Sequence, residues 1–316
     1  MKKITILIPA YNEEQVLNIL YERLINVIDS IDTYEFEMLF INDGSKDKTL
    51  DIIKEIREND KRVSYIDFSR NFGKEIAMIA GMDYSNSDAV LIIDADLQDP
   101  PELLPEMLKY WEDGYDDVYA KRRSRQGESW FKKLSSKVFY KTLQNMTNIP
   151  IQKDTGDFRL LDRRCVEALK MFRETQRYTK GMFSWIGYNK KEILFDRDQR
   201  AAGSTKWNYF KLFDLAIEGI TSFTISPLKM SSYFGIGISL CAFVFMLIVI
   251  MKTLLLGEKV QGYTSLMVVV LFLGGVQLIC LGIIGEYIGR IFNETKKRPL
   301  YLVNHFNGEK IIQNKG

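Results

Sequence analysis

Short apolar runs alternate with amphipathic stretches through the first third of the chain. Runs typical of buried β-strands occur at residues 3–8, 36–41, 63–68 and 89–93. The stretches between them place apolar residues at helical spacing, as at Leu17, Leu20 and Leu24. Alternation of strands and helices at these lengths predicts a mostly parallel sheet with helices on both faces. Ligands of such sheets bind beyond the carboxyl ends of the strands.

Two long apolar segments follow near the end of the chain. Residues 233–251 and 263–285 contain no charged side chain, and the first apolar run continues to about residue 256. A membrane-spanning helix needs roughly 20 apolar residues. Each segment is long enough, so the sequence predicts a transmembrane helical hairpin with spans at about 233–256 and 263–285. A buried core hairpin is the alternative.

Basic residues flank this hairpin on both sides, whereas the short connection carries Lys259 beside Glu258. The flanking residues are Lys206, Lys211, Lys229, Arg290, Lys296, Lys297 and Arg298. The excess of positive charge on cytoplasmic flanks therefore predicts a multi-pass protein of the plasma (inner) membrane with its polar domain in the cytoplasm. We expect that domain at residues 1–206, juxtamembrane amphipathic helices at 207–229, membrane helices within 230–289 and a cytoplasmic tail at 290–316.

Composition excludes several classes of protein. The 43 basic and 41 acidic residues leave a net charge of +2, which argues against a nucleic-acid binder. Three cysteines of unrelated spacing and the lone His305 give little support to a disulfide framework, a zinc site or histidine catalysis. Neither G-x-G-x-x-G nor G-x-x-x-x-G-K-[ST] occurs, so the usual phosphate-binding loops are missing from the sequence.

Acidic residues follow three of the predicted strands, at Glu13, Asp43 and Asp94. Asp94 and Asp96 lie two positions apart, and side chains at that spacing on an extended backbone point the same way. Two adjacent carboxylates repel each other unless a proton or a cation lies between them. Oxygen ligands of this kind suit Mg²⁺ or Mn²⁺. A solvated acidic corner is the alternative for so short a motif.

Seven motifs together resemble glycosyltransferase family 2. The resemblance is closest to its dolichol-phosphate-mannose-synthase-like branch, in particular to bacterial polyprenyl-phosphate glycosyltransferases with two C-terminal membrane helices. It extends from Ile4 to about Val303, and it is the order and spacing of the motifs that make it specific. The motifs are residues 8–14 (IPAYNEE), 42–45 (NDGS), 94–101 (DADLQDPP), 154–159 (DTGDFR), 199–207 (QRAAGSTKW), 285–290 (GEYIGR) and 298–299 (RP).

The resemblance implies a Rossmann-like, nucleotide-sugar-binding domain of the GT-A type and a set of site residues. Asp157, Asp96 and Arg200 are the expected catalytic residues, and Asp94, Asp96 and Gln98 the expected ligands of Mg²⁺ or Mn²⁺. The residues expected to bind the nucleotide are Pro9, Tyr11, Glu13, Asp43, Lys74 and Asp94. Those expected to bind an acceptor phosphate are Arg122, Arg125, Arg200, Ser204 and Lys206. Capping and turn roles for the acids, and a solvated basic face, are the alternatives.

The role of Asp157 stays open. The family's usual proposal is a general base, but a phosphomonoester has a second pKa of about 6 and is already largely anionic near neutrality. Such a nucleophile hardly needs deprotonation. The alternative roles for Asp157 are to orient the sugar or to hold the basic residues that bind the acceptor phosphate.

The resemblance implies transfer of one hexose from a UDP-sugar to polyprenyl (undecaprenyl) phosphate with inversion, at the cytoplasmic face of the bilayer. Glucose is the first choice of sugar and N-acetylglucosamine the second. A processive polysaccharide synthase and a non-catalytic membrane scaffold are the rival interpretations. Self-association, and a downstream flippase with an envelope glycosyltransferase, are further hypotheses.

Overall fold

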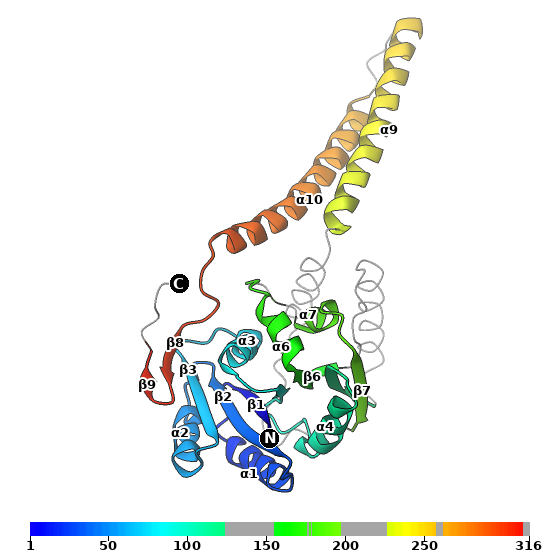
Figure 1. The fold of residues 1–316 in the computed structure, drawn as a ribbon. Helices are drawn as coiled ribbons and strands as arrows, with labels where there is room; N and C mark the ends of the chain where they lie inside the picture. Colours follow the sequence, from blue (N-terminus) through cyan, green and yellow to red (C-terminus); the bar gives the residue numbers. More distant parts are fainter. Residues whose placement is uncertain (124–154, 176, 178, 197–225, 257–261, 312–316) are drawn as a thin grey trace. The chain divides into compact units, whose positions relative to one another are not determined.

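The computed structural model describes residues 1–123, 155–175, 177, 179–196, 226–256 and 262–311 (Figure 1). The chain forms two compact units. The first contains residues 1–212 and 299–316, and the second contains residues 213–298. The residues that precede and follow the second unit therefore belong to the same first unit.

The described part of the first unit is built on a nine-stranded sheet with the order β7-β5-β6-β4-β1-β2-β3-β8-β9. Strands β1 to β4 pair in parallel, as the sequence predicts, whereas β6 runs antiparallel between β4 and β5. The strands are β1 (Lys2–Ala10), β2 (Tyr34–Asn42), β3 (Val63–Phe68), β4 (Ala89–Ile92), β5 (Asp117–Arg122), β6 (Thr155–Asp162), β7 (Lys190–Phe195), β8 (Val303–Phe306) and β9 (Glu309–Lys310).

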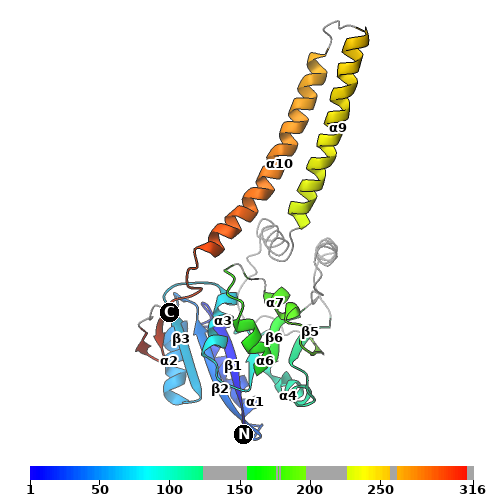
Figure 2. The same cartoon turned by 45° about the horizontal axis from the view of Figure 1, so that its top comes forward.

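Helices cover both faces of this sheet (Figure 1; Figure 2). Apolar residues of α1, α2 and α4 form one core with Ile4, Ile6 and Ile8 of β1, while α3 packs on the opposite face against β1 and β2. The helices of this unit are α1 (Leu17–Ile28), α2 (Thr49–Asn59), α3 (Lys74–Tyr84), η1 (Pro101–Leu103), α4 (Leu104–Glu112), α6 (Arg163–Lys170) and α7 (Thr179–Trp185). The alternation of β1 side chains between the two faces is the period-two pattern of a strand buried on both sides.

Gly81 lets α3 approach the sheet closely. A Cβ atom at this position would lie 2.5 Å from Cδ1 of Leu7 and 2.9 Å from Cδ1 of Ile41. The helix therefore packs with its backbone almost in contact with β1 and β2. Since α3 begins at Lys74, this packing fixes where the Lys74 side chain lies relative to the strand ends.

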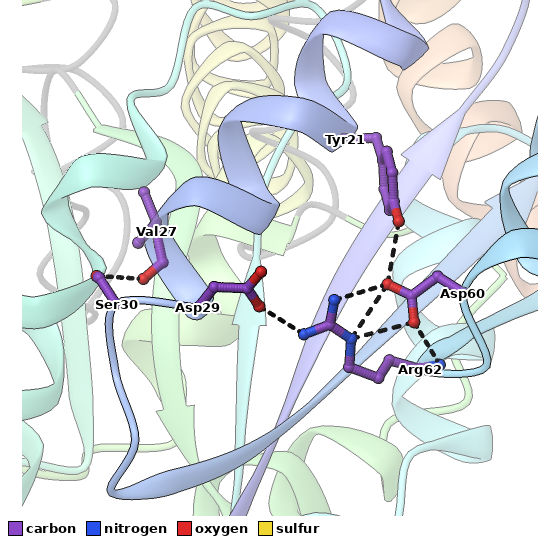
Figure 3. Close-up of polar contacts among 6 residues, drawn as sticks. All are labelled: Tyr21, Val27, Asp29, Ser30, Asp60 and Arg62. Carbon is purple, nitrogen blue, oxygen red and sulfur yellow. Dashed lines mark hydrogen bonds and ion pairs between the residues drawn. The ribbon is translucent and has the colours of Figure 1, made fainter.

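Arg62 stabilises the edge of the sheet where the first parallel strands begin (Figure 3). Its guanidinium donates to Asp29 at 2.7 Å and to Asp60 at 2.9 Å, and Asp60 also accepts from the Tyr21 hydroxyl at 3.0 Å. Burial alone would raise the pKa of Asp60, but the hydrogen bonds from Arg62 and Tyr21 outweigh it and hold the pKa below its usual value. This network joins α1, α2 and the start of β3.

The end of the chain completes the sheet instead of forming a separate tail. Strand β8 pairs antiparallel with β3, and β9 pairs with β8. Three side-chain contacts add to the ladder: Tyr301 donates to Asp83 at 2.8 Å, Asn304 donates to Asp67 at 3.2 Å, and His305 lies 3.3 Å from Asp67. The tail expected from residue 290 thus has two parts that the sequence did not separate, the end of α10 and a docked β-hairpin.

The second unit contains the long helices α9 (Ser226–Leu256) and α10 (Tyr263–Thr295), which pack against each other (Figure 2). Within the described residues, one segment, Phe272–Thr295, is long and apolar enough to cross a membrane. A span within α9 stays a prediction. Residues 207–225 of the expected juxtamembrane region lie outside the described residues, and residues 226–229 begin α9.

Candidate active site

The loops that follow β1 and β2 are bonded to each other at the carboxyl edge of the sheet. The backbone N–H of Asn12 donates to Ser45 Oγ at 3.0 Å, and that of Glu13 donates to Thr49 Oγ1 at 2.8 Å. Asn12 adopts a positive φ of 56°, a conformation that asparagine tolerates better than most residues. Pro9, the last residue but one of β1, pairs with Ile41, and Tyr11 projects from the loop with 41% of its surface exposed.

Asp43 holds the loop after β3 in place. Its two carboxylate oxygens accept hydrogen bonds from the backbone N–H groups of Phe72 at 2.6 Å and Gly73 at 2.9 Å. Burial raises the pKa of Asp43, and these two bonds offset only part of the rise. The neighbouring Gly44 has φ +66°, and a Cβ there would lie 2.4 Å from the carbonyl carbon of Arg70. Asp43, a residue of the predicted nucleotide pocket, therefore also fixes the conformation of the loop after β3.

The Asp94-Ala95-Asp96 motif lies in the turn after β4 and not on a strand. The expectation that an extended backbone aligns the side chains of Asp94 and Asp96 is therefore wrong. Strand β4 ends at Ile92, and the backbone N–H of Gln98 turns back to donate to Asp96 Oδ1 at 3.2 Å. Leu97 between them has a positive φ of 60°. The turn keeps Asp94 and Asp96 at the strand end, half-buried, and buries the predicted metal ligand Gln98.

Lys74 joins Asp94 to Asp157. Its ammonium lies 2.6 Å from Asp94 Oδ1 and 2.5 Å from Asp157 Oδ2. The antiparallel register explains why two carboxylates distant in sequence meet here. Ile92 of β4 pairs with Arg159 of β6, so two positions further along Asp94 comes opposite Asp157. Lys74, which the sequence assigns to the nucleotide, forms a bridge between two predicted site residues.

This ion bridge sets the charge state of Asp157. Burial alone would raise its pKa, but the charge and hydrogen bond of Lys74, followed by the charges of Lys180 and Arg159, hold it below the usual value. Burial likewise would lower the pKa of Lys74, and the charges of Asp94 and Asp157 raise it instead. Asp157 is therefore a stable carboxylate, and Lys74 a stable ammonium, throughout the neutral range.

Asp99 joins the acidic group, although it was not among the site residues expected from the sequence. It is 3% exposed, and burial raises its pKa to about 7, helped by the charges of Asp94 and Asp96. Burial also raises the pKa of Asp94, with Lys74 opposing the rise and Asp157 and Asp96 adding to it. Carboxylates that disfavour each other's charged forms gain from a cation placed among them.

The carboxylates fit a hard divalent cation by chemistry, although they are not arranged around one. Among the described residues, no group of three or more His, Cys, Asp or Glu side chains has the geometry of a metal site. Asp94 instead contacts the ammonium of Lys74. Asp94 and Asp96 offer the oxygen donors that Mg²⁺ and Mn²⁺ prefer, and Gln98 adds a carboxamide beside them.

The structure describes only some of the residues expected to bind the acceptor phosphate. Arg122 ends β5, and its Nη2 atom lies 3.9 Å from where a Cβ of Gly156 would be. Among the residues expected to bind the acceptor phosphate or to act in catalysis, Arg125, Arg200, Ser204 and Lys206 lie outside the described residues. Their assignment stays a prediction.

A matching family model extends over residues 5–170, which is more than half of the chain, and describes glycosyl transferase family 2. The chain belongs to this family. A second model, the GtrB C-terminal hairpin, matches residues 226–291, which are nearly all of α9 and α10. The protein is thus a family 2 glycosyltransferase with a GT-A-like fold, and its C-terminal hairpin associates it with membranes.

Similar proteins align with almost the whole chain. An uncharacterized glycosyltransferase of Synechocystis sp. is 51% identical over 97% of this chain and 96% of its own length. A prophage bactoprenol glucosyl transferase homolog of Escherichia coli is 42% identical over 95% of this chain and 98% of its own. The bactoprenol glucosyl transferase of Shigella phage SfX shows the same identity and the same coverage.

Proposed function

We propose that this glycosyltransferase moves glucose from UDP-glucose to the phosphate of a polyprenyl lipid at the cytoplasmic face of the membrane. The proposal is carried mainly by the full-length similarity to proteins named bactoprenol glucosyl transferase, which includes the C-terminal hairpin. A hairpin anchor has a clear use for such an acceptor. A polyprenyl phosphate presents its phosphate at the membrane surface, and a tethered active site meets it at high effective concentration.

The donor side of the site consists of the loops after β1, β2 and β4. Exposed Tyr11 offers an aromatic face for the uracil ring, and Glu13 lies in the loop beside it. Asp94 and Asp96 would hold a Mg²⁺ or Mn²⁺ ion, whose chemistry would be to neutralise the charge that develops on the departing diphosphate. Because Lys74 occupies one side of Asp94, it neutralises part of this acidic group by itself.

The reaction needs no strong base. An oxygen of the lipid phosphate attacks C1 of glucose, the bond from C1 to the UDP oxygen breaks, and UDP leaves with the electron pair. The attacking oxygen is already anionic near neutrality, since the second pKa of a phosphomonoester is about 6. Asp157, held ionised by Lys74, would orient sugar hydroxyls or basic groups of the acceptor site. Attack opposite UDP gives the inverted β-linked lipid phosphosugar.

Chain connectivity and charge support the proposed topology. Both ends of the hairpin lead into the first unit, so an even number of spans keeps that unit on one side of the membrane. The basic residues on both flanks favour the cytoplasmic side.

A donor panel tests this proposal. Membranes containing the protein are incubated with labelled UDP-glucose, UDP-N-acetylglucosamine or UDP-galactose, and the lipid extract is assayed for label released by mild acid. We expect label from UDP-glucose, and none from UDP-glucose in a matched Asp96→Asn variant that is still folded and inserted. Preferred labelling from another donor would replace glucose by that sugar, and full activity of Asp96→Asn would contradict the metal role.

A further inference from the structure

Lys180, near the start of α7, lies within electrostatic range of the Asp157 carboxylate without forming an ion pair, and it was not among the residues expected from the sequence. Asp157 supplies the main attractive charge acting on it, whereas Arg122, Lys74 and Arg159 repel it. The Lys180 side chain is half-buried. One carboxylate and three other cations are thus close enough to Lys180 to affect its charge.

Contacts on both sides of Lys180 hold α7 in place. Glu75, next to Lys74 on α3, lies close to Thr179 at the start of α7. Further along α7, the Phe183 ring packs 3.6 Å from the guanidinium carbon of Arg159, and its carbonyl accepts from the Lys190 ammonium. These contacts hold the backbone of α7, and with it the position of Lys180.

Two other cations of this group are already paired. Lys74 is bound to Asp94 and Asp157, and Arg159 forms a fully buried ion pair with Asp117 at 3.0 Å. In contrast, the ammonium of Lys180 makes no hydrogen bond or ion pair with any residue that the structure describes. The incomplete pairing is consistent with its electrostatics, since burial lowers the pKa of Lys180 more than the attraction of Asp157 raises it.

Arg122 is in a similar position. Its Nε atom is buried without a hydrogen-bond partner in the described part of the chain, and its Nη2 atom lies beside Gly156. Leaving a buried donor unpaired is unfavourable, and the half-buried ammonium of Lys180 also has no partner, so the two cationic groups indicate that an anion belongs there.

We propose that Lys180, together with Arg122, binds the phosphate of the acceptor next to Asp157. This inference rests on the proposed function, and it adds a residue to the acceptor site. A compact ammonium and a planar guanidinium both bind phosphate oxygens, the first as a point charge and the second through paired donors.

The charges favour the acceptor phosphate over the donor diphosphate as the group bound here. The donor side is acidic, because Asp94, Asp96 and Asp99 gather after β4, and it suits a diphosphate only with a cation added. Lys180 and Arg122 supply two positive charges without a metal. Lys180 and Arg122 therefore suit an anion, whereas the acidic turn after β4 suits a cation.

The test measures lipid binding apart from sugar transfer. Purified full-length wild type, Lys180→Met, Lys180→Arg and Lys170→Met are compared in detergent for binding of undecaprenyl phosphate and, separately, of UDP. Lys170 is a matched control, because its ammonium is paired with Glu167 at 3.1 Å on α6. We expect Lys180→Met to weaken lipid phosphate binding roughly 10- to 100-fold, the effect of losing a charged hydrogen bond. UDP affinity should stay within about twofold, and Lys180→Arg should recover most of the lipid binding.

The melting temperature separates this role from a structural one. Replacing a half-buried ammonium that has no partner by methionine should leave Tm unchanged or raise it. Unchanged lipid binding in Lys180→Met, a loss confined to UDP, or a fall in Tm that accounts for the lost binding would each overturn the inference. If wild type binds undecaprenyl phosphate in a Lys180-dependent way but transfers no glucose, the inference stands and the proposed donor fails. If wild type does not bind the lipid phosphate, the inference fails.

Discussion

Replacing Lys74 by methionine should destabilise the catalytic unit and inactivate it, because this residue holds two carboxylates together. The ammonium contacts Asp94 at 2.6 Å and Asp157 at 2.5 Å, and its side chain is 39% exposed. Methionine keeps most of the length of the side chain and removes the charge. Two facing carboxylates would then be left without their shared cation.

The size of the effect follows from how far the bridge is buried. Exposed ion pairs contribute about 0–1 kcal/mol, and breaking a fully buried pair costs about 3–5 kcal/mol. The Lys74 side chain is partly exposed, so we expect its loss to lower the free energy of unfolding by an intermediate amount, about 2 kcal/mol. For a unit of this size, 1 kcal/mol corresponds to roughly 2–4 °C in melting temperature, so Tm should fall by about 4–8 °C.

A double-mutant cycle isolates the interaction. Tm and transfer activity are measured for wild type, Lys74→Met, Asp157→Asn and the double variant, with Lys54→Met as a control. Lys54 lies 4.0 Å from Asp51 on the exposed side of α2, and its loss should change stability by less than about 0.5 kcal/mol. Asp157→Asn should relieve part of the repulsion in Lys74→Met, so the double variant should be more stable than the sum of the single effects by about 1 kcal/mol. Additive effects, or a Tm of Lys74→Met within 1 °C of wild type on this roughly 2 kcal/mol scale, would refute the bridge.

Three further changes test other parts of the structure. Arg62→Ala should lower stability by about 1 kcal/mol without changing transfer, as measured by Tm and kcat, because its network lies away from the site. Gly81→Ala should cost about 1–3 kcal/mol and lower activity, since the new Cβ meets Leu7, and adding Leu7→Ala should recover part of the stability. Burial raises the pKa of Glu75 to about 7 from an ordinary 4.5, so its contribution to stability is present below about pH 4.5 and is lost as pH rises through 7. Glu75→Gln should flatten the dependence of Tm on pH in that interval, and an unchanged slope would contradict the assignment.

The sequence predicted the parallel core well because its strands are continuous apolar runs, and the structure confirms all four within a residue or two. It also predicted that Asp94 and Asp157 belong to one site, from the resemblance. It did not predict the antiparallel β6, whose register brings these two residues together, because the pairing depends on which strands become neighbours and not on either strand's own pattern.

Three features were missed for related reasons. The role of Lys74 as a bridge arises from the packing of α3, and Lys180 becomes notable only because it has no partner while Lys74 and Arg159 are ion-paired. Both are single lysines in a lysine-rich chain, so composition and spacing give no signal for them. The sequence does not predict the β-hairpin at residues 303–310, because strands this short lack a readable periodicity and depend on the free edge of β3.

The central claim is glucosyl transfer to a lipid phosphate, and product analysis with purified components tests it most directly. The full-length protein is incubated with UDP-glucose, undecaprenyl phosphate and Mg²⁺ or Mn²⁺, and the lipid fraction is analysed by mass spectrometry. We predict a lipid phosphate carrying a single hexose, formed in a one-to-one ratio with UDP, and no such product from Asp157→Asn. Release of free glucose without a lipid-linked hexose, or a lipid carrying several hexoses, would contradict the account.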